Sequence, residues 1–235
     1  MQISDYFFLF FTVFAAGSIG FFVQKNTQFW LQIFLSFSGA YIFGITMLHL
    51  LPEVFAKLSE EAGYWILLGF FIQLLLEQIS RGVEHGHFHL PHQPSGSFAV
   101  QIMTGLCVHA FFEGIPLSNI GDSHLFYGII LHHAPAAFAL VVLFLSSKYT
   151  PKTAFFCLLL FSFMPPLGAT IGANLQLSDV TEHRIISVVI GSFLHIATTI
   201  LFEVDSSGSA SNHHQIPWRR LLAIAVGIAT AAAIS

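Results

Sequence analysis

Long apolar runs separated by short polar stretches set the pattern of this sequence. A run of roughly 20 mostly apolar residues can cross a bilayer as a helix. Eight segments reach this length, at about 5–24, 29–55, 64–80, 98–117, 126–147, 153–175, 185–203 and 217–235. Only two linkers between them are long, at 81–97 and 204–217. The pattern predicts an all-α integral membrane protein with about eight transmembrane helices, forming a single transmembrane domain over residues 1–235.

Composition favours the same class. The chain is 55% hydrophobic and 9% charged, whereas soluble domains carry about a quarter charged residues. The net charge of -4 offers no basic face for a nucleic acid. Cys107 and Cys157 lie in apolar runs and are predicted to be small buried hydrophobic residues, not a disulfide. The first run lacks a preceding basic region, so we interpret it as a span and not as a removable signal peptide.

The basic residues predict an orientation, because Lys and Arg gather in cytoplasmic loops. If both termini lie outside, the outward loops carry only Lys57 and Arg184. The inward loops then carry Lys25, Arg81, Lys148, Lys152, Arg219 and Arg220. We therefore expect a multi-pass protein of the cell membrane (the inner membrane, if bacterial) with both termini outside and the 81–97 loop in the cytoplasm.

Prolines interrupt three of the predicted spans. Pro116, Pro135 and the pair Pro165-Pro166 lie within or near the ends of the fourth, fifth and sixth segments. Each removes a backbone hydrogen bond, and in lipid the freed carbonyl must be satisfied by protein or by a wet cavity. We therefore expect these segments to surround a polar path. Small residues would allow close helix approach, namely Gly105, Gly168, Ala169 and Gly172.

Polar residues inside two of the spans suggest a metal site. His109 and Glu113 lie four residues apart and share one helical face, and the adjacent His132 and His133 lie in the next segment. Two imidazoles, one carboxylate and water describe an open site for Zn²⁺ or a similar metal such as Fe²⁺, not for Mg²⁺ or Ca²⁺. Because adjacent helical residues diverge by about 100°, we expect one of His132 and His133 to line the site and the other to contact a neighbouring helix. The alternative is a set of polar contacts that only joins helices.

Other histidines suggest a route to and from this site. His49 and Glu53 repeat the four-residue spacing near the outer end of the second segment, and His195 lies in the seventh. We interpret these three as candidates for metal access or for the pathway. The loop residues His85, His87, His89 and His92 form a tract typical of transient metal capture.

Together these motifs resemble the ZIP family of zinc and iron permeases. The second segment ends in His49-Leu-Leu-Pro-Glu53, and a histidine-rich loop follows the third. His109, Glu113 and Gly114 match the family's fourth span, His132 and Pro135 its fifth, and Pro166-Leu-Gly168 its sixth. The resemblance implies eight spans in an inverted 3+2+3 arrangement. It also implies divalent metal movement into the cytoplasm, by one helix bundle sliding or rocking against another.

The departures from the family pattern also carry information. Ala110, Ala136 and Pro165 stand where relatives have ligands of a second metal site. We therefore predict a mononuclear transporter, unless His133 rebuilds part of the second site. The expected partners are a divalent metal as transported substrate and the lipid bilayer, with a homodimer left open and no organic cofactor. A non-transporting metal sensor and, less favoured, a membrane non-haem iron enzyme are the alternatives.

Overall fold

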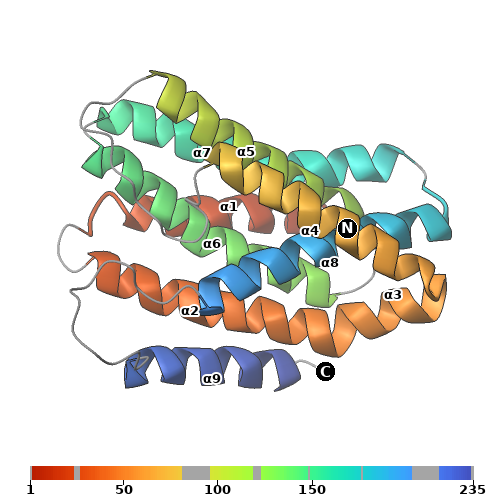
Figure 1. Cartoon of the computed structure of the whole chain (residues 1–235). Coiled ribbons are helices and arrows are strands. Elements are labelled where there is room, and N and C mark those ends of the chain that lie inside the picture. Colours follow the sequence, from red (N-terminus) through yellow and green to blue (C-terminus); the bar gives the residue numbers. More distant parts are fainter. Residues whose placement is uncertain are drawn as a thin grey trace.

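The computed structural model describes residues 2–23, 27–80, 96–118, 123–147, 149–175, 177–202 and 217–233. Every regular element among them is helical. In chain order they are α1 (Ile3–Ile19), α2 (Thr27–Ile45), the π-helix η1 (Thr46–Leu50), α3 (Leu51–Leu58), α4 (Glu61–Ser80), α5 (Gly96–Gly114), the 3-10 helix η3 (Ile115–Ser118), α6 (Ser123–Ser146), α7 (Pro151–Asn174), α8 (Asp179–Phe202) and α9 (Trp218–Ala233). The helices run side by side in one elongated bundle (Figure 1). The predicted all-α class is confirmed.

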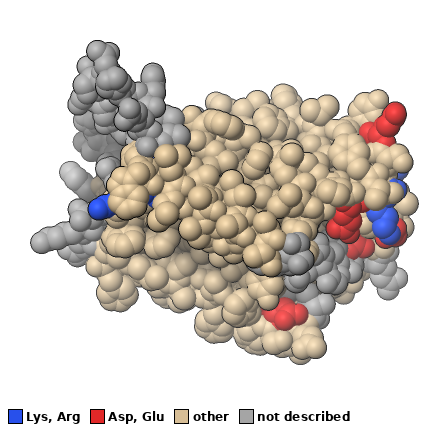
Figure 2. All heavy atoms as spheres, turned by 90° about the horizontal axis from the view of Figure 1, so that it is seen from below, with Lys and Arg blue, Asp and Glu red and all other residues tan. Residues whose placement is uncertain are grey.

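Six of these helical stretches are long and apolar enough to cross a membrane: Phe29–Leu58, Glu61–Ser80, Gly96–Leu117, His124–Ser146, Pro151–Asn174 and Asp179–Phe202. In the described part of the chain, α1 and α9 are shorter, at 17 and 16 residues. Large apolar side chains such as Phe22, Leu67 and Phe156 point outward. The face in Figure 2 is mostly uncharged, with acidic and basic residues gathered mainly toward its ends. This distribution suits a molecule whose middle is solvated by lipid.

Helix packing agrees with the predicted inverted 3+2+3 arrangement. The most extensive contacts join α4 to α8 and α2 to α9, followed by α5 to α7 and α1 to α6 (Figure 1). In such a repeat, the first three segments correspond to the last three, and the fourth corresponds to the fifth. The contact of α4 with α8 (third and seventh segments) then corresponds to that of α9 with α2 (eighth and second). The contact of α5 with α7 likewise corresponds to that of α6 with α1.

Glycines permit the closest of these contacts. A Cβ on Gly69 of α4 would lie 1.9 Å from the carbonyl oxygen of Val188 on α8, and one on Gly191 would lie 2.0 Å from that of Ile66. Between α5 and α7, a Cβ on Gly168 would lie 2.1 Å from the carbonyl oxygen of Phe111. The predicted close approach at Gly168 is therefore present.

The second segment is not one regular helix. Pro52 has no N–H to donate, and just before it the Leu51 N–H bonds to the carbonyl of Thr46, five residues back. The resulting π-helix η1 rotates the residues before Pro52 relative to those after it. The other prolines take the expected places: Pro135 lies inside α6, Pro165 and Pro166 inside α7, and Pro116 in η3.

The described cysteines are both free, as expected, although Cys107 and Cys157 are half-buried and not fully enclosed.

Candidate metal centre

Helices α5 and α6 bring His109, Glu113 and His132 together in the interior of the bundle. The three side chains are 1–3% exposed. The His109 Nε2 lies 3.3 Å from the His132 Nε2 and 3.2 Å from the Glu113 Oε1. One donor atom from each residue lies within 4.8 Å of the other two. The predicted cluster therefore exists as a group of converging donors.

The spacing of these donors fits one metal ion. Zinc binds nitrogen and oxygen at about 2.0–2.2 Å, so two ligands of a tetrahedral ion lie about 3.4 Å apart. The two measured separations from His109 are close to that value. A carboxylate this deep in a bundle is costly unless donors or a cation offset its charge. The three groups thus have the donor atoms and the spacing that could hold one divalent metal ion.

His109 is oriented by residues outside the donor set. The Ser192 hydroxyl on α8 donates to the Gln73 Oε1 on α4 at 3.1 Å, and its oxygen lies 3.4 Å from the His109 Nδ1. A hydroxyl has a single hydrogen, so here it accepts from the Nδ1–H of the imidazole. The lone pair of the His109 ring is then on Nε2, which faces Glu113 and His132.

His133 reaches the same cluster from the other side. Its Nδ1 lies 2.9 Å from the carbonyl oxygen of Ile129 and donates to it, while its Nε2 lies 3.6 Å from the Glu113 Oε2. The fully buried ring stacks between the rings of His109 and Phe161. The two oxygens of Glu113 therefore face different histidines, and both His132 and His133 approach the carboxylate.

Apolar residues occupy the three positions at which the resemblance implies ligands of a second metal site. Ala110, Ala136 and Pro165 are all buried and contribute no side-chain donor. Of the second-site positions singled out in the sequence, His133 alone brings a metal-binding group to Glu113.

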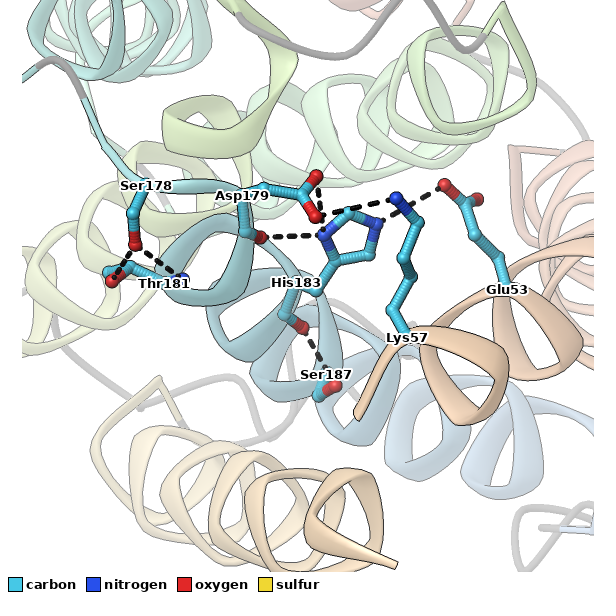
Figure 3. A network of polar contacts seen from close by, with 7 residues as sticks. All are labelled: Glu53, Lys57, Ser178, Asp179, Thr181, His183 and Ser187. Atoms are coloured by element: carbon cyan, nitrogen blue, oxygen red, sulfur yellow. Dashed lines mark hydrogen bonds and ion pairs between the residues drawn. The ribbon is translucent and has the colours of Figure 1, made fainter. Parts of the chain in front are cut away.

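The predicted access pair lies across the junction of η1 and α3, with His49 in the π-helix and Glu53 in α3. His49 places its Nε2 3.3 Å from the carbonyl oxygen of Ala231 on α9, and its ring stacks on that of His124 with centroids 4.2 Å apart. Glu53 turns instead toward α8, where its Oε1 lies 3.6 Å from the Nε2 of His183 (Figure 3). The two residues therefore contact different helices.

His195 contacts a carboxylate that the sequence interpretation missed. Its Nε2 lies 2.5 Å from the Oε2 of Glu77 on α4, and both are largely buried. Gln73 and Glu77 lie one turn apart within a mostly apolar run, and this spacing could have identified them. Ser192 and His183 gave no comparable signal, because their partners are distant in sequence. The loop residues His85, His87, His89 and His92 lie outside the described residues.

Known proteins share this sequence pattern. A family model described as ZIP Zinc transporter matches residues 89–235. Human zinc transporter ZIP1 is 25% identical over 218 residues, which cover 71% of this chain and 67% of ZIP1. Zinc transporter ZIP9 of Micropogonias undulatus is 29% identical over 172 residues, covering 65% of this chain and 54% of the relative. Zinc transporter ZIP9 of Xenopus tropicalis is 29% identical over 173 residues, covering 65% of this chain and 56% of the relative.

The chain spans about half to two thirds of the length of these relatives. The match to the family model covers more than half of the chain and includes α5 to α9. It therefore contains His109, Glu113, His132 and His133. Its apolar helices make it a multi-pass membrane protein. The chain belongs to the ZIP family of zinc transporters.

Proposed function

We propose that this chain transports Zn²⁺, or a similar divalent metal such as Fe²⁺, across the membrane and into the cytoplasm. The observation that carries the proposal is the buried convergence of His109, Glu113 and His132 at separations that suit one ion. The relatives of this chain are named zinc transporters, which favours zinc as the metal and transport over catalysis or sensing. The substrate is the metal ion itself, and we propose no organic cofactor.

The three donors perform complementary tasks in this proposal. An ion in the bilayer needs replacements for its lost hydration shell. The neutral imidazoles of His109 and His132 supply nitrogen ligands, and the Glu113 carboxylate also offsets part of the ion's charge. Three protein ligands leave a coordination position for water, which allows the ion to exchange.

Release on the opposite side requires the site to change its exposure. Helices α1, α5, α6 and α7 pack mainly on one another, and α2, α8 and α9 pack with α4. All three proposed ligands lie in the first group, while Ser192 and Gln73 lie in the second. Movement of the first group against the second would carry the ligands past α4 and α8. We propose this as the transport step, with His195 and Glu77 lining the pathway and the loop histidines receiving the ion.

We further propose that one ion occupies the central site at a time. Ala110, Ala136 and Pro165 offer no side-chain ligand, which supports a mononuclear site. His133 beside the Glu113 Oε2 is the feature that would allow a second ion. The proposed setting is the cell membrane with both termini outside, and a homodimer stays a prediction.

Uptake of radioactive Zn²⁺ into proteoliposomes tests the transport proposal. We expect His109→Ala and Glu113→Ala to lower uptake at least 10-fold, because each removes a ligand. Thr170→Ala is a matched control in α7: among the described residues, the exposed Thr170 hydroxyl donates only to the Pro166 carbonyl, so uptake should be unchanged. Equal uptake by wild type and both site variants would refute the proposed site.

A further inference from the structure

A second group of polar residues lies where α3 meets the first turn of α8 (Figure 3), at one end of the bundle (Figure 1). Glu53 and Lys57 come from α3, and Asp179 and His183 come from α8. We propose that Glu53 and His183 form a second divalent metal site, which binds the ion before the central site does. Metal binding at this pair does not depend on the transport proposal, although its role as a loading site does.

His183 presents one defined nitrogen. Its Nδ1 lies 2.7 Å from the backbone carbonyl oxygen of Asp179, so Nδ1 must carry a hydrogen and donate it. In the neutral ring the lone pair is then on Nε2, the atom that faces Glu53. His133 in the central cluster is held in the same way, through the Ile129 carbonyl. The backbone of the first turn of α8 therefore orients His183 as a nitrogen ligand.

The opposing carboxylate stands at ligand distance. The His183 Nε2 and the Glu53 Oε1 are 3.6 Å apart, beyond an ordinary hydrogen bond but close to the roughly 3.4 Å between two ligands of a tetrahedral ion. The same 3.6 Å separates the His133 Nε2 from the Glu113 Oε2. One nitrogen and one oxygen ligand with water in the remaining positions would give a weak, exchangeable site.

The surrounding charges favour a cation at this position. Lys57 lies 3.3 Å from the Asp179 carboxylate, so this lysine is paired with a residue other than Glu53. Arg184 is paired with Glu61 at 2.7 Å. Glu182 adds a further carboxylate in the first turn of α8. The balance among these side chains is acidic, which raises the local concentration of metal cations.

Exposure separates this pair from the central cluster. The Glu53 side chain is 36% exposed while that of His183 is 8% exposed, whereas the central ligands are at most 3% exposed. Ser192, which touches His109, lies nine positions after His183, a rise of about 14 Å along α8. The Glu53–His183 pair is thus distinct from the central site and open enough to receive an ion from water.

Zinc titration of the purified full-length chain, with the four loop histidines replaced by Asn, tests the proposal. We expect two bound Zn²⁺ per chain, one at each site. His183→Lys preserves an ion pair with Glu53 but removes the neutral nitrogen ligand, so it should bind one. His183→Cys retains a donor and should bind two, with the preference for Cd²⁺ over Zn²⁺ at this site raised about 10-fold by the soft thiolate.

The central site serves as the internal check on folding. His109→Ala should remove the central ion alone, so a failure of the transport proposal can be distinguished from a failure of this one. If His183→Lys bound as many ions as the parent chain, the pair would be an ion pair only and the proposal would be overturned. Loss of the ion in His183→Cys, with the central ion retained, would also overturn it.

Discussion

Three buried histidines share one arrangement, in which Nδ1 is held by a partner and Nε2 faces a carboxylate. The partner is Ser192 for His109 and a backbone carbonyl one turn earlier for His133 and His183. Outer partners of this kind fix the tautomer and the direction of a metal-binding imidazole. Ser192 could not be predicted from the sequence, because 83 residues separate it from His109 and a serine in a span has many uses.

Ser192→Ala should weaken zinc binding at the central site by about 10-fold to 100-fold, the usual effect of losing an outer partner. The physical reason is that the His109 ring loses the acceptor that holds Nδ1. Zinc titration of the chain with Asn at the four loop positions and His183→Lys would measure the central site alone. Ser187→Ala is the control, since in the described part of the chain the Ser187 hydroxyl donates only to the His183 carbonyl, one turn earlier on α8. A central Kd equal to that of the parent would show that Ser192 does not orient the ligand.

Helices were easier to predict than the irregularities within them. Each apolar run corresponds to an observed helix or pair of helices, because length and hydrophobicity identify spans. The π-helix at Thr46–Leu50 was not predicted, and it places His49 in a different kind of helix from Glu53, which lies in α3. Helix α8 begins at Asp179, before its apolar run, because the Ser178 hydroxyl accepts a hydrogen bond from the Thr181 N–H. His183 follows directly after that polar first turn.

Close contact between α4 and α8 depends on Gly69. We expect Gly69→Ala to destabilise the protein by about 1–3 kcal/mol, because the new methyl group would collide with the backbone of Val188. The thermal unfolding midpoint in detergent should then fall by roughly 5 °C. Gly63→Ala is the matched control on the same helix, since no atom of the described residues lies within 4 Å of the position that its methyl group would occupy, and it should not lower the midpoint. Equal midpoints for both variants would contradict the packing account.

The whole molecule combines a lipid-facing exterior with polar contacts along α8. His183, Ser192 and His195 on this helix contact Glu53, His109 and Glu77, respectively. The sequence alone predicted the central cluster, because polar residues in an apolar run are conspicuous. It could not pair His195 with Glu77 or His183 with Glu53, since these contacts arise only when the inverted halves pack together.

The direction of transport depends on how the bundle sits in the membrane. In a chain with Cys107 and Cys157 replaced by Ala, Gln2→Cys should react with an impermeant maleimide in intact cells, since the basic residues favour termini outside. Ser95→Cys, in the loop predicted to be cytoplasmic, should react only after permeabilisation. The reverse labelling pattern would invert the proposed orientation and place the Glu53–His183 pair on the cytoplasmic side.

The central claim is that one ion binds between α5 and α6. Anomalous X-ray diffraction from crystals grown with Zn²⁺, recorded on both sides of the zinc absorption edge, tests it most directly. We predict a single anomalous peak in the centre of the bundle, at about 2.0–2.2 Å from donor atoms of His109, Glu113 and His132. Two peaks on either side of Glu113 would contradict the mononuclear site, and an empty centre in crystals that hold zinc elsewhere would contradict the transport site itself.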